Sequence, residues 1–157
     1  MILFHASSVI VERPDVLHSR QRVDFGPGFY TTPLLKQAYG WCQKFLREGK
    51  DAYICRYALE DAAFRQCKVL AFDAYSEEWL DFVVQCRAGM CRTDADIVTG
   101  GVANDKVFDT VELFLDNLID RKEALRRLRF EKPNAQVCIR TQAVIDRFLH
   151  FNGLLSM

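Results

Sequence analysis

The order of strand-like and helix-like segments is the feature that most limits what this chain can fold into. Short apolar or alternating runs predict strands, whereas longer stretches with apolar residues on one helical face predict helices. The strands come first and are then interleaved with helices in no steady strand–helix–strand rhythm. This order predicts an α+β fold with mostly antiparallel sheets rather than a doubly wound parallel sheet. The length of 157 residues fits a single domain, 1–157, with one substantial core.

The individual segments follow from the same patterns and from capping residues. Thr32 followed by Pro33 predicts the start of a helix, Gly49 predicts its end, and Ser76 begins a second amphipathic helix. We expect strands at 1–5, 7–12, 28–32, 51–60, 67–73, 97–99 and 135–140, and helices at 33–49, 76–87, 106–116, 120–128 and 141–151, with a brief tail after the last helix.

The charges of the chain balance, because 21 basic and 21 acidic side chains cancel and the pI is about 6.8. No overall field therefore favours nucleic acid or an anionic membrane, and any nucleic-acid contact has to be local. The start, MILFHASSVIVERPDV, lacks a basic region and meets Glu12, Arg13 and Pro14 early, so it predicts neither a signal peptide nor a membrane span. We expect a cytoplasmic protein that does not contact a membrane.

The cysteines raise the question of a disulfide framework or a metal site. No pair has C-x-x-C spacing, and most lie in apolar surroundings where a reduced thiol acts as a small hydrophobic side chain. The histidines also show no ligand spacing. We therefore expect no metal site and six reduced thiols, those of Cys42, Cys55, Cys67, Cys86, Cys91 and Cys138.

The loop DFGPGFYTT, residues 24–32, places two glycines and a proline just before an aromatic pair. Gly26 and Gly28 permit backbone angles that other residues avoid, and Pro27 fixes its own φ. The residues alone leave two interpretations open. The loop makes a tight turn between strands, or it lets the backbone approach a bound ligand closely.

Four motifs, in this order, carry a resemblance to a known family: LFHASS, DFGPGFYTT, DIVTGGVANDKVF and NAQVCIRT. The first two resemble the first motifs of the ADP-ribosyltransferase superfamily in its His-Tyr-Glu branch. Together the four are most similar to the bacterial DUF3990 family, over nearly the whole chain. The resemblance implies two packed antiparallel sheets with NAD⁺, as a substrate, in the cleft between them.

On the matching positions, the resemblance implies three catalytic residues. His5 would hydrogen-bond a ribose hydroxyl and help to seat the nicotinamide end of NAD⁺, and Tyr30 would stack on the nicotinamide ring. Gln136 stands where the branch usually has a glutamate. A glutamine keeps the hydrogen bond to the ribose but lacks the negative charge that favours the oxocarbenium-like state. Glu131 and Asp24 are the nearby candidates for a substitute carboxylate.

Further contacts to NAD⁺ are expected from the segments around these motifs. Ala6 stands where the branch usually has a glycine, and Pro27 where a lysine is often found. Arg20 and Arg22 are candidate clamps for the diphosphate, because guanidinium groups donate forked hydrogen bonds. Besides His5 and Tyr30, the expected NAD⁺-binding residues are Ala6, Ser7, Arg20, Asp24, Phe25, Gly26, Gly28, Phe29, Trp41, Asn104 and Asp105.

These residues also have plainer interpretations that the sequence leaves open. His5 at a strand end can be an ordinary hydrogen-bonded histidine, and Tyr30 and Trp41 can belong to the core. Asn104 and Asp105 follow a double glycine, where an Asx turn explains them equally well.

The resemblance implies a mono-ADP-ribosyltransferase that cleaves NAD⁺ and passes ADP-ribose to a macromolecular acceptor. It also suggests a bacterial toxin–antitoxin setting with a small protein inhibitor. Two alternatives stay open: an NAD⁺ glycohydrolase, in which water is the acceptor, and a catalytically silent module that binds ADP-ribose or a partner protein. The balanced charge leaves protein, RNA and DNA open as the acceptor.

Overall fold

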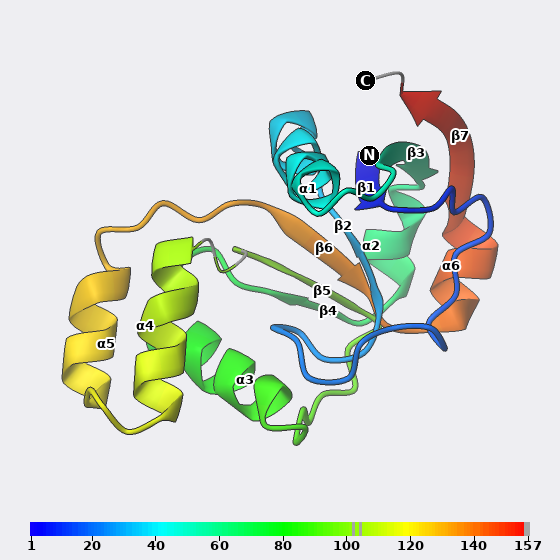
Figure 1. Ribbon diagram of the computed structural model, residues 1–157. Coiled ribbons are helices and arrows are strands. Elements are labelled where there is room, and N and C mark those ends of the chain that lie inside the picture. The colour runs from blue at the N-terminus through cyan, green and yellow to red at the C-terminus, as the bar shows by residue number, and fades with distance from the viewer. Residues whose placement is uncertain (102, 104, 156–157) are drawn as a thin grey trace.

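The protein is built from two β-sheets with helices around them (Figure 1). The computed structural model describes residues 1–101, 103 and 105–155. One sheet has the strand order β1-β3-β7, and the other has the order β2-β6-β5-β4. Among the described residues every strand pairing is antiparallel except that of β4 with β5. The predicted α+β class with mostly antiparallel sheets is therefore confirmed.

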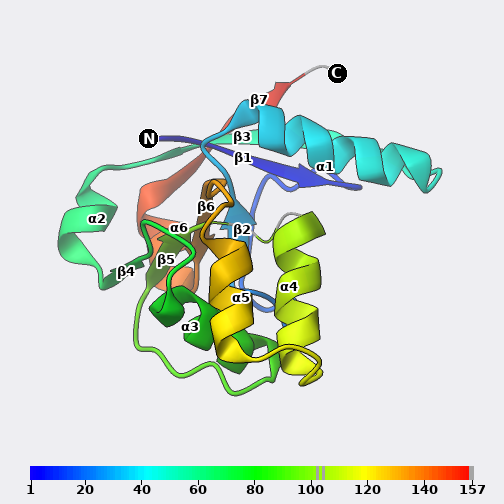
Figure 2. The same ribbon diagram turned by 90° about the vertical axis from the view of Figure 1, so that its left-hand side faces the viewer.

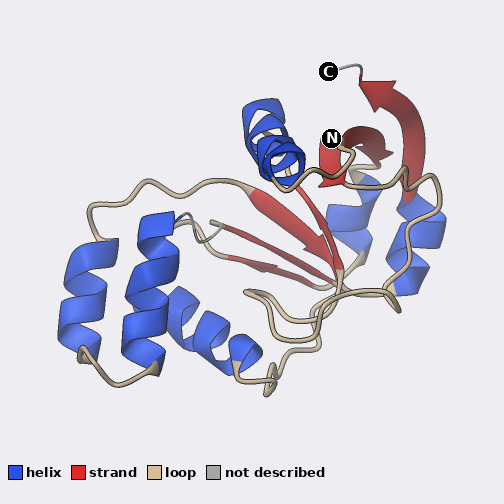
Figure 3. Cartoon of the chain, viewed as in Figure 1, coloured by secondary structure: helices blue, strands red, loops and turns tan. Residues whose placement is uncertain are grey.

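The elements alternate along the chain without a regular rhythm, as Figure 3 shows. The strands are β1 (Ile2–Ser7), β2 (Phe29–Thr31), β3 (Tyr53–Leu59), β4 (Val69–Ala71), β5 (Ile97–Gly100), β6 (Gln136–Ile139) and β7 (Leu149–Leu155). The helices are α1 (Leu35–Arg47), α2 (Ala62–Gln66), α3 (Glu77–Arg87), α4 (Asp105–Leu115), α5 (Arg121–Leu128) and α6 (Gln142–Phe148).

The two sheets pack against each other through one buried apolar cluster. It joins side chains of the three-stranded sheet with side chains of the four-stranded sheet, among them Leu3, Tyr57, Leu149, Phe29, Ile97, Val137 and Ile139. The backbones of the two sheets also meet directly, because Phe4 and Thr32 exchange two hydrogen bonds of 2.8 and 2.9 Å. Helix α1 lies over the other face of the first sheet, where Ala38 and Cys42 contact Ala6 and Ile54.

The other face of the four-stranded sheet is covered by α3, α4 and α5 (Figures 1 and 2). Successive residues of a strand point to opposite faces. Val137 and Ile139 therefore join the cluster between the sheets, while Cys138 packs under the helices. Because both faces are covered, β6 is buried along its whole length. Gln136, two residues before Cys138, points to the same face as Cys138.

One of the two predicted helix caps is confirmed, and the other is wrong. Ser76 caps α3, since its hydroxyl accepts a hydrogen bond from the backbone N–H of Trp79 at 3.2 Å. Thr32 does not cap α1, because the N-cap position is Leu34 and no side chain caps this helix. The Thr32 hydroxyl accepts from Leu34 N at 3.0 Å, and α1 begins at Leu35.

The strand predicted at 7–12 is wrong, because β1 ends at Ser7 and the chain then leaves the sheet. Of the apolar residues in this segment only Val11 packs against the sheets, whereas Val9 and Ile10 are exposed. Val11 contacts the cluster between the sheets, its N–H donates to Cys55 Sγ at 3.4 Å, and its carbonyl accepts from the Tyr57 hydroxyl. The segment is therefore a loop that Val11 alone anchors to the core.

The helix predicted at 141–151 is too long, and a strand was missed. Helix α6 ends at Phe148, and the chain continues directly into β7, which pairs with β3. The free backbone groups of β3 on this side give residues 149–155 a partner that no local pattern shows. The short helix α2 was also not predicted.

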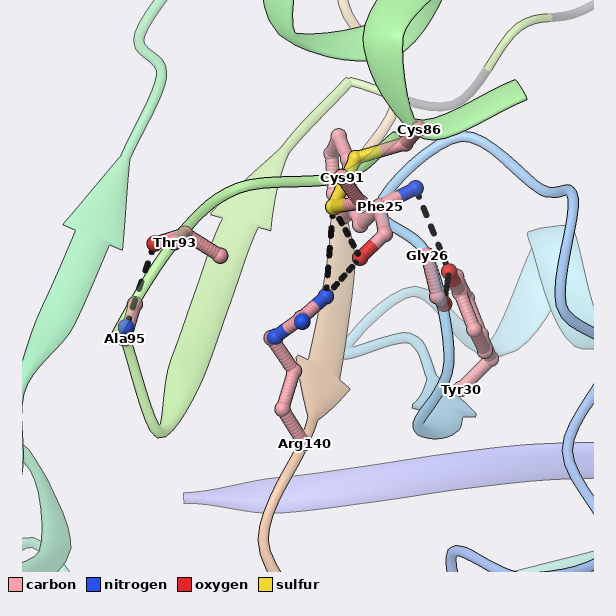
Figure 4. The surroundings of a disulfide bond; sticks show 8 residues. All are labelled: Phe25, Gly26, Tyr30, Cys86, Cys91, Thr93, Ala95 and Arg140. Atoms are coloured by element: carbon pink, nitrogen blue, oxygen red, sulfur yellow. Dashed lines mark hydrogen bonds between the residues drawn. A yellow bond between two sulfur atoms is a disulfide. The ribbon is translucent and has the colours of Figure 1, made fainter. Parts of the chain in front are cut away.

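The prediction of six reduced thiols is wrong, because Cys86 and Cys91 form a disulfide (Figure 4). Cys86 lies in the last turn of α3, and Gly89 adopts a positive φ of 78° just after the helix. This reversal returns the chain so that Cys91 meets Cys86, which sequence spacing alone does not show. The remaining cysteines, Cys42, Cys55, Cys67 and Cys138, are free.

In the described part of the chain, no helix combines the length and the apolar character that crossing a membrane requires.

The disulfide predicts a thiol count. Protein purified without reductant and then denatured should titrate four thiols, and six after reduction. The Cys91→Ser variant should titrate five without reduction, the four free thiols plus Cys86. Six thiols in unreduced wild-type protein would contradict the disulfide.

Gly28 should tolerate no side chain. A Cβ atom there would lie 2.5 Å from Cys138 Sγ and 2.8 Å from the Ile139 carbonyl oxygen. Such overpacking typically costs about 1–3 kcal/mol, so Gly28→Ala should lower the free energy of unfolding in urea by that amount.

Gly40→Ala is the matched control. Its Cβ meets nothing within 4 Å on α1, so it should raise stability by up to about 1 kcal/mol. Equal stabilities for the two variants would refute the packing account.

Candidate functional site

A cavity of about 1240 Å³ opens beside the place where the two sheets meet. Its walls come from β1, β2, the start of β6, helices α1 and α4, and the long loop between β1 and β2. The cavity brings together most of the residues expected to contact NAD⁺: His5, Ala6, Ser7, Arg20, Asp24, Gly28, Phe29, Tyr30, Trp41 and Gln136.

Four of the residues expected to contact NAD⁺ are not among the described residues that line the cavity. Phe25 is fully buried in the core below the loop, and Gly26 lies beside Cys91 and Arg140. Asn104 lies outside the described residues. Asp105 begins α4, and its side chain is not described.

His5 sits at the junction of the sheets with its ring tied to β2. Its Nδ1 lies 2.7 Å from the carbonyl oxygen of Tyr30. Because a carbonyl oxygen only accepts hydrogen bonds, Nδ1 carries the proton and donates it. Burial lowers the pKa of His5, and the bond to Tyr30 offsets only part of that effect. The ring is therefore neutral at neutral pH, and Nε2 is its hydrogen-bond acceptor.

Tyr30 is fixed by its own loop, as Figure 4 shows. Its hydroxyl donates to the Gly26 carbonyl and accepts from Phe25 N at 3.2 Å. Burial raises the pKa of Tyr30 far above its usual value, so the phenol stays protonated. Since the hydroxyl is engaged, what Tyr30 offers the cavity is a ring in a fixed position.

Gln136 is the least satisfied polar residue of the wall. It begins β6 and is only 5% exposed. Its Nε2 is buried and has no hydrogen-bond partner among the described residues. Register places it close to Tyr30, because Tyr30 pairs with Cys138, two residues along β6 on the same face. A buried amide donor without a partner costs free energy, so this wall is suited to a ligand that accepts a hydrogen bond.

Asp24 lines the cavity, but its carboxylate belongs to a buried ion-pair network. Arg87 donates to Asp24 Oδ1 from Nε at 2.8 Å and from Nη2 at 2.7 Å. Asp24 Oδ2 accepts from Ala103 N at 3.2 Å. The Arg87 and Asp24 side chains are 9% and 13% exposed. Both carboxylate oxygens are committed, so Asp24 anchors the glycine loop.

The two glycines of the loop are explained by packing. Gly26 has a φ of 69°, and a Cβ there would lie 2.8 Å from Cys91 Sγ. A side chain at Gly28 would enter β6. Both positions therefore need glycine whether or not a ligand lies above the loop.

The cavity also contains residues that the sequence analysis did not select. Lys44 and Phe45 follow Trp41 by three and four positions on α1, a helical spacing that could have identified them. The sequence gives no comparable signal for the cavity residues of α4. The pattern of an amphipathic helix shows which side of the helix is polar, but it does not show what that polar side faces in the folded protein. The lining residues of α4 and the residue just after it are Phe108, Glu112, Leu115 and Asp116.

Glu131, a candidate substitute carboxylate, lies away from this cavity. It lines a separate pocket of about 430 Å³ together with Lys106, Arg126 and Phe130. Among the described residues there is also no cluster of three or more His, Cys, Asp or Glu side chains that could hold a metal ion.

A family model described as a protein of unknown function, DUF3990, matches residues 1–151. The chain belongs to the DUF3990 family. No curated protein and no solved structure matches it. The match covers every element of the DUF3990 fold up to the first residues of β7, including all walls of the cavity.

The buried, neutral His5 predicts a pH dependence of stability for this DUF3990 protein. The unfolded chain protonates His5 near pH 6.5, whereas burial lowers the folded pKa. As the pH falls below 6.5 the unfolded state gains a proton that the folded state lacks, so stability falls until the folded pKa is reached.

His5→Asn keeps a donor for the Tyr30 carbonyl but does not titrate. Wild type should lose more stability than His5→Asn between about pH 7 and 5, by at most about 1.4 kcal/mol per pH unit. Urea unfolding at each pH measures this, and parallel curves would show that His5 is not desolvated.

Proposed function

We propose that this DUF3990 protein binds NAD⁺ in the large cavity and transfers its ADP-ribose to a macromolecular acceptor. The observation that carries the proposal is that Gln136 lines the cavity while its buried Nε2 has no hydrogen-bond partner among the described residues. A ribose hydroxyl or another oxygen acceptor of a ligand would supply the missing hydrogen bond.

The neighbouring side chains are suited to the nicotinamide riboside half of NAD⁺. The neutral His5 offers Nε2 to a ribose hydroxyl, and the fixed ring of Tyr30 offers a face on which a nicotinamide ring can stack. Ala6 lies next to His5 on the same wall. Its backbone N–H and C=O are suited to a carboxamide.

The rest of the cavity is suited to a larger ligand. Its volume of about 1240 Å³ exceeds the roughly 300–1,000 Å³ of pockets for drug-sized ligands, which leaves room for a dinucleotide. Arg20 and Arg22 line it and would pair with a diphosphate through forked donors.

In the proposed reaction the bond between ribose C1′ and the nicotinamide nitrogen breaks, and its electron pair leaves with nicotinamide. Positive charge develops on the ribose, and the acceptor nucleophile then forms the new bond to C1′. Gln136 can orient the ribose, but its amide supplies no negative charge. This difference favours one second candidate, a module that binds NAD⁺ or ADP-ribose without cleaving it.

Gln136→Met tests the proposal by separating stability from binding. Methionine has a similar volume and removes the unpaired donor, so the unliganded variant should be more stable by on the order of 1 kcal/mol. The same change should weaken NAD⁺ binding, seen as a smaller rise in melting temperature with millimolar NAD⁺.

The wild-type protein decides between the candidates in the same assay. A rise in melting temperature with nicotinamide release supports transfer or hydrolysis, and added cell lysate separates these two. A rise without release supports the binding module. No rise with NAD⁺, or an unchanged rise in Gln136→Met, would refute the proposed site.

A further inference from the structure

The proposed transfer has one chemical requirement that Gln136 does not meet. The acceptor must lose a proton as it attacks C1′, and a nearby carboxylate is a suitable base that also favours positive charge on the ribose. The cavity wall contains five carboxylates, those of Asp15, Asp24, Glu48, Glu112 and Asp116.

Three of these carboxylates have other partners. Asp24 has both oxygens committed to Arg87 and Ala103. Asp15 accepts from the backbone N–H groups of Leu17 and His18. Glu48 forms a 2.6 Å ion pair with Lys50. Asp116 lies exposed just after the end of α4, and among the described residues its side chain has no hydrogen-bond or ion-pair partner.

Glu112 also has an ion-pair partner, but that partner is the buried Arg87, which is 9% exposed, whereas the Lys50 partner of Glu48 is 56% exposed. Glu112 is therefore held in place while its own side chain stays accessible. Its Oε1 accepts from Arg87 Nη1 at 2.9 Å, and its side chain is 45% exposed. Arg87 is itself immobilised by Asp24 and lies 4.6 Å above the centre of the Phe108 ring, one turn before Glu112. Among the described residues, the second oxygen of Glu112 has no hydrogen-bond partner.

A continuous chain of contacts connects Glu112 to the Tyr30 end of the cavity. Glu112 bonds Arg87, and Arg87 bonds Asp24. The next residue after Asp24, Phe25, donates its N–H to the Tyr30 hydroxyl at 3.2 Å. Helix α4 thus places the Glu112 carboxylate on the wall of the same cavity that Tyr30 lines, and its partner Arg87 binds the glycine loop that holds the Tyr30 hydroxyl.

We propose that Glu112 is the catalytic carboxylate of this site, which rests on the proposed function. The lone pair of an acceptor hydroxyl or amine forms the bond to C1′, and its proton passes to the free oxygen of Glu112. Nicotinamide leaves with the electron pair of the broken bond, and Glu112 later returns the proton to solvent. A carboxylate from α4 therefore provides the charge that the amide at the start of β6 lacks.

Glu112→Gln is the decisive variant, because its amide oxygen can still accept from Arg87 while the charge and the basic oxygen are lost. NAD⁺ should raise its melting temperature as much as that of wild type. Single-turnover nicotinamide release, in buffer and with lysate, should fall by about a hundredfold or more. Glu112→Asp should recover part of the rate, which a merely structural role would not predict.

Asp109→Asn is the matched control, since it removes a carboxylate from the same helix but lines the separate pocket. It should keep the wild-type rate. If Glu112→Gln releases nicotinamide as fast as wild type, or if Asp109→Asn loses as much, the role of Glu112 is refuted and the proposed function stands. If wild type binds NAD⁺ but releases no nicotinamide under either condition, both transfer and the role of Glu112 are refuted.

Discussion

The two backbone hydrogen bonds between Phe4 and Thr32 are the constraint on which the rest of the site depends. These bonds join the edge strand β1 of one sheet to Thr32, directly after the edge strand β2 of the other. The next residue of β1, His5, adds a third bond across this junction, from its ring to the Tyr30 carbonyl. With the sheets joined at this point and packed through a shared core, the space beside the junction becomes a cavity with rigid walls. A site built on strands holds its groups more precisely than one built on loops alone.

The ion-pair network of Asp24, Arg87 and Glu112 has a complementary role on the other side of the cavity. Burying charged groups costs desolvation free energy, so such a network contributes little to net stability. What it provides is position, because the guanidinium joins the glycine loop, α3 and α4 at one point. The same side chain that anchors the loop therefore also orients the carboxylate of α4.

The wall of the cavity contains one polar group that folding alone does not explain. The buried amide of Gln136 would be replaced without loss by an apolar side chain if folding alone mattered, since its Nε2 finds no partner among the described residues. The glycines of the loop are the opposite case. Packing against Cys138 and Cys91 accounts for both of them, so they are weak indicators of a ligand even though they drew attention to the loop.

The sequence by itself determined the α+β class, most of the strands and helices and the Ser76 cap, because periodicity and capping are local properties. The resemblance of its motifs also predicted His5, Tyr30 and Gln136 as site residues, and the fold brings these three residues to one cavity. Only the tertiary structure decided that residues 149–155 form a strand, since their partner β3 lies about ninety residues away. It alone brought Cys91 to Cys86 and turned Glu112 of α4 toward the cavity. Such pairings depend on how elements pack in space, which no spacing within a single segment records.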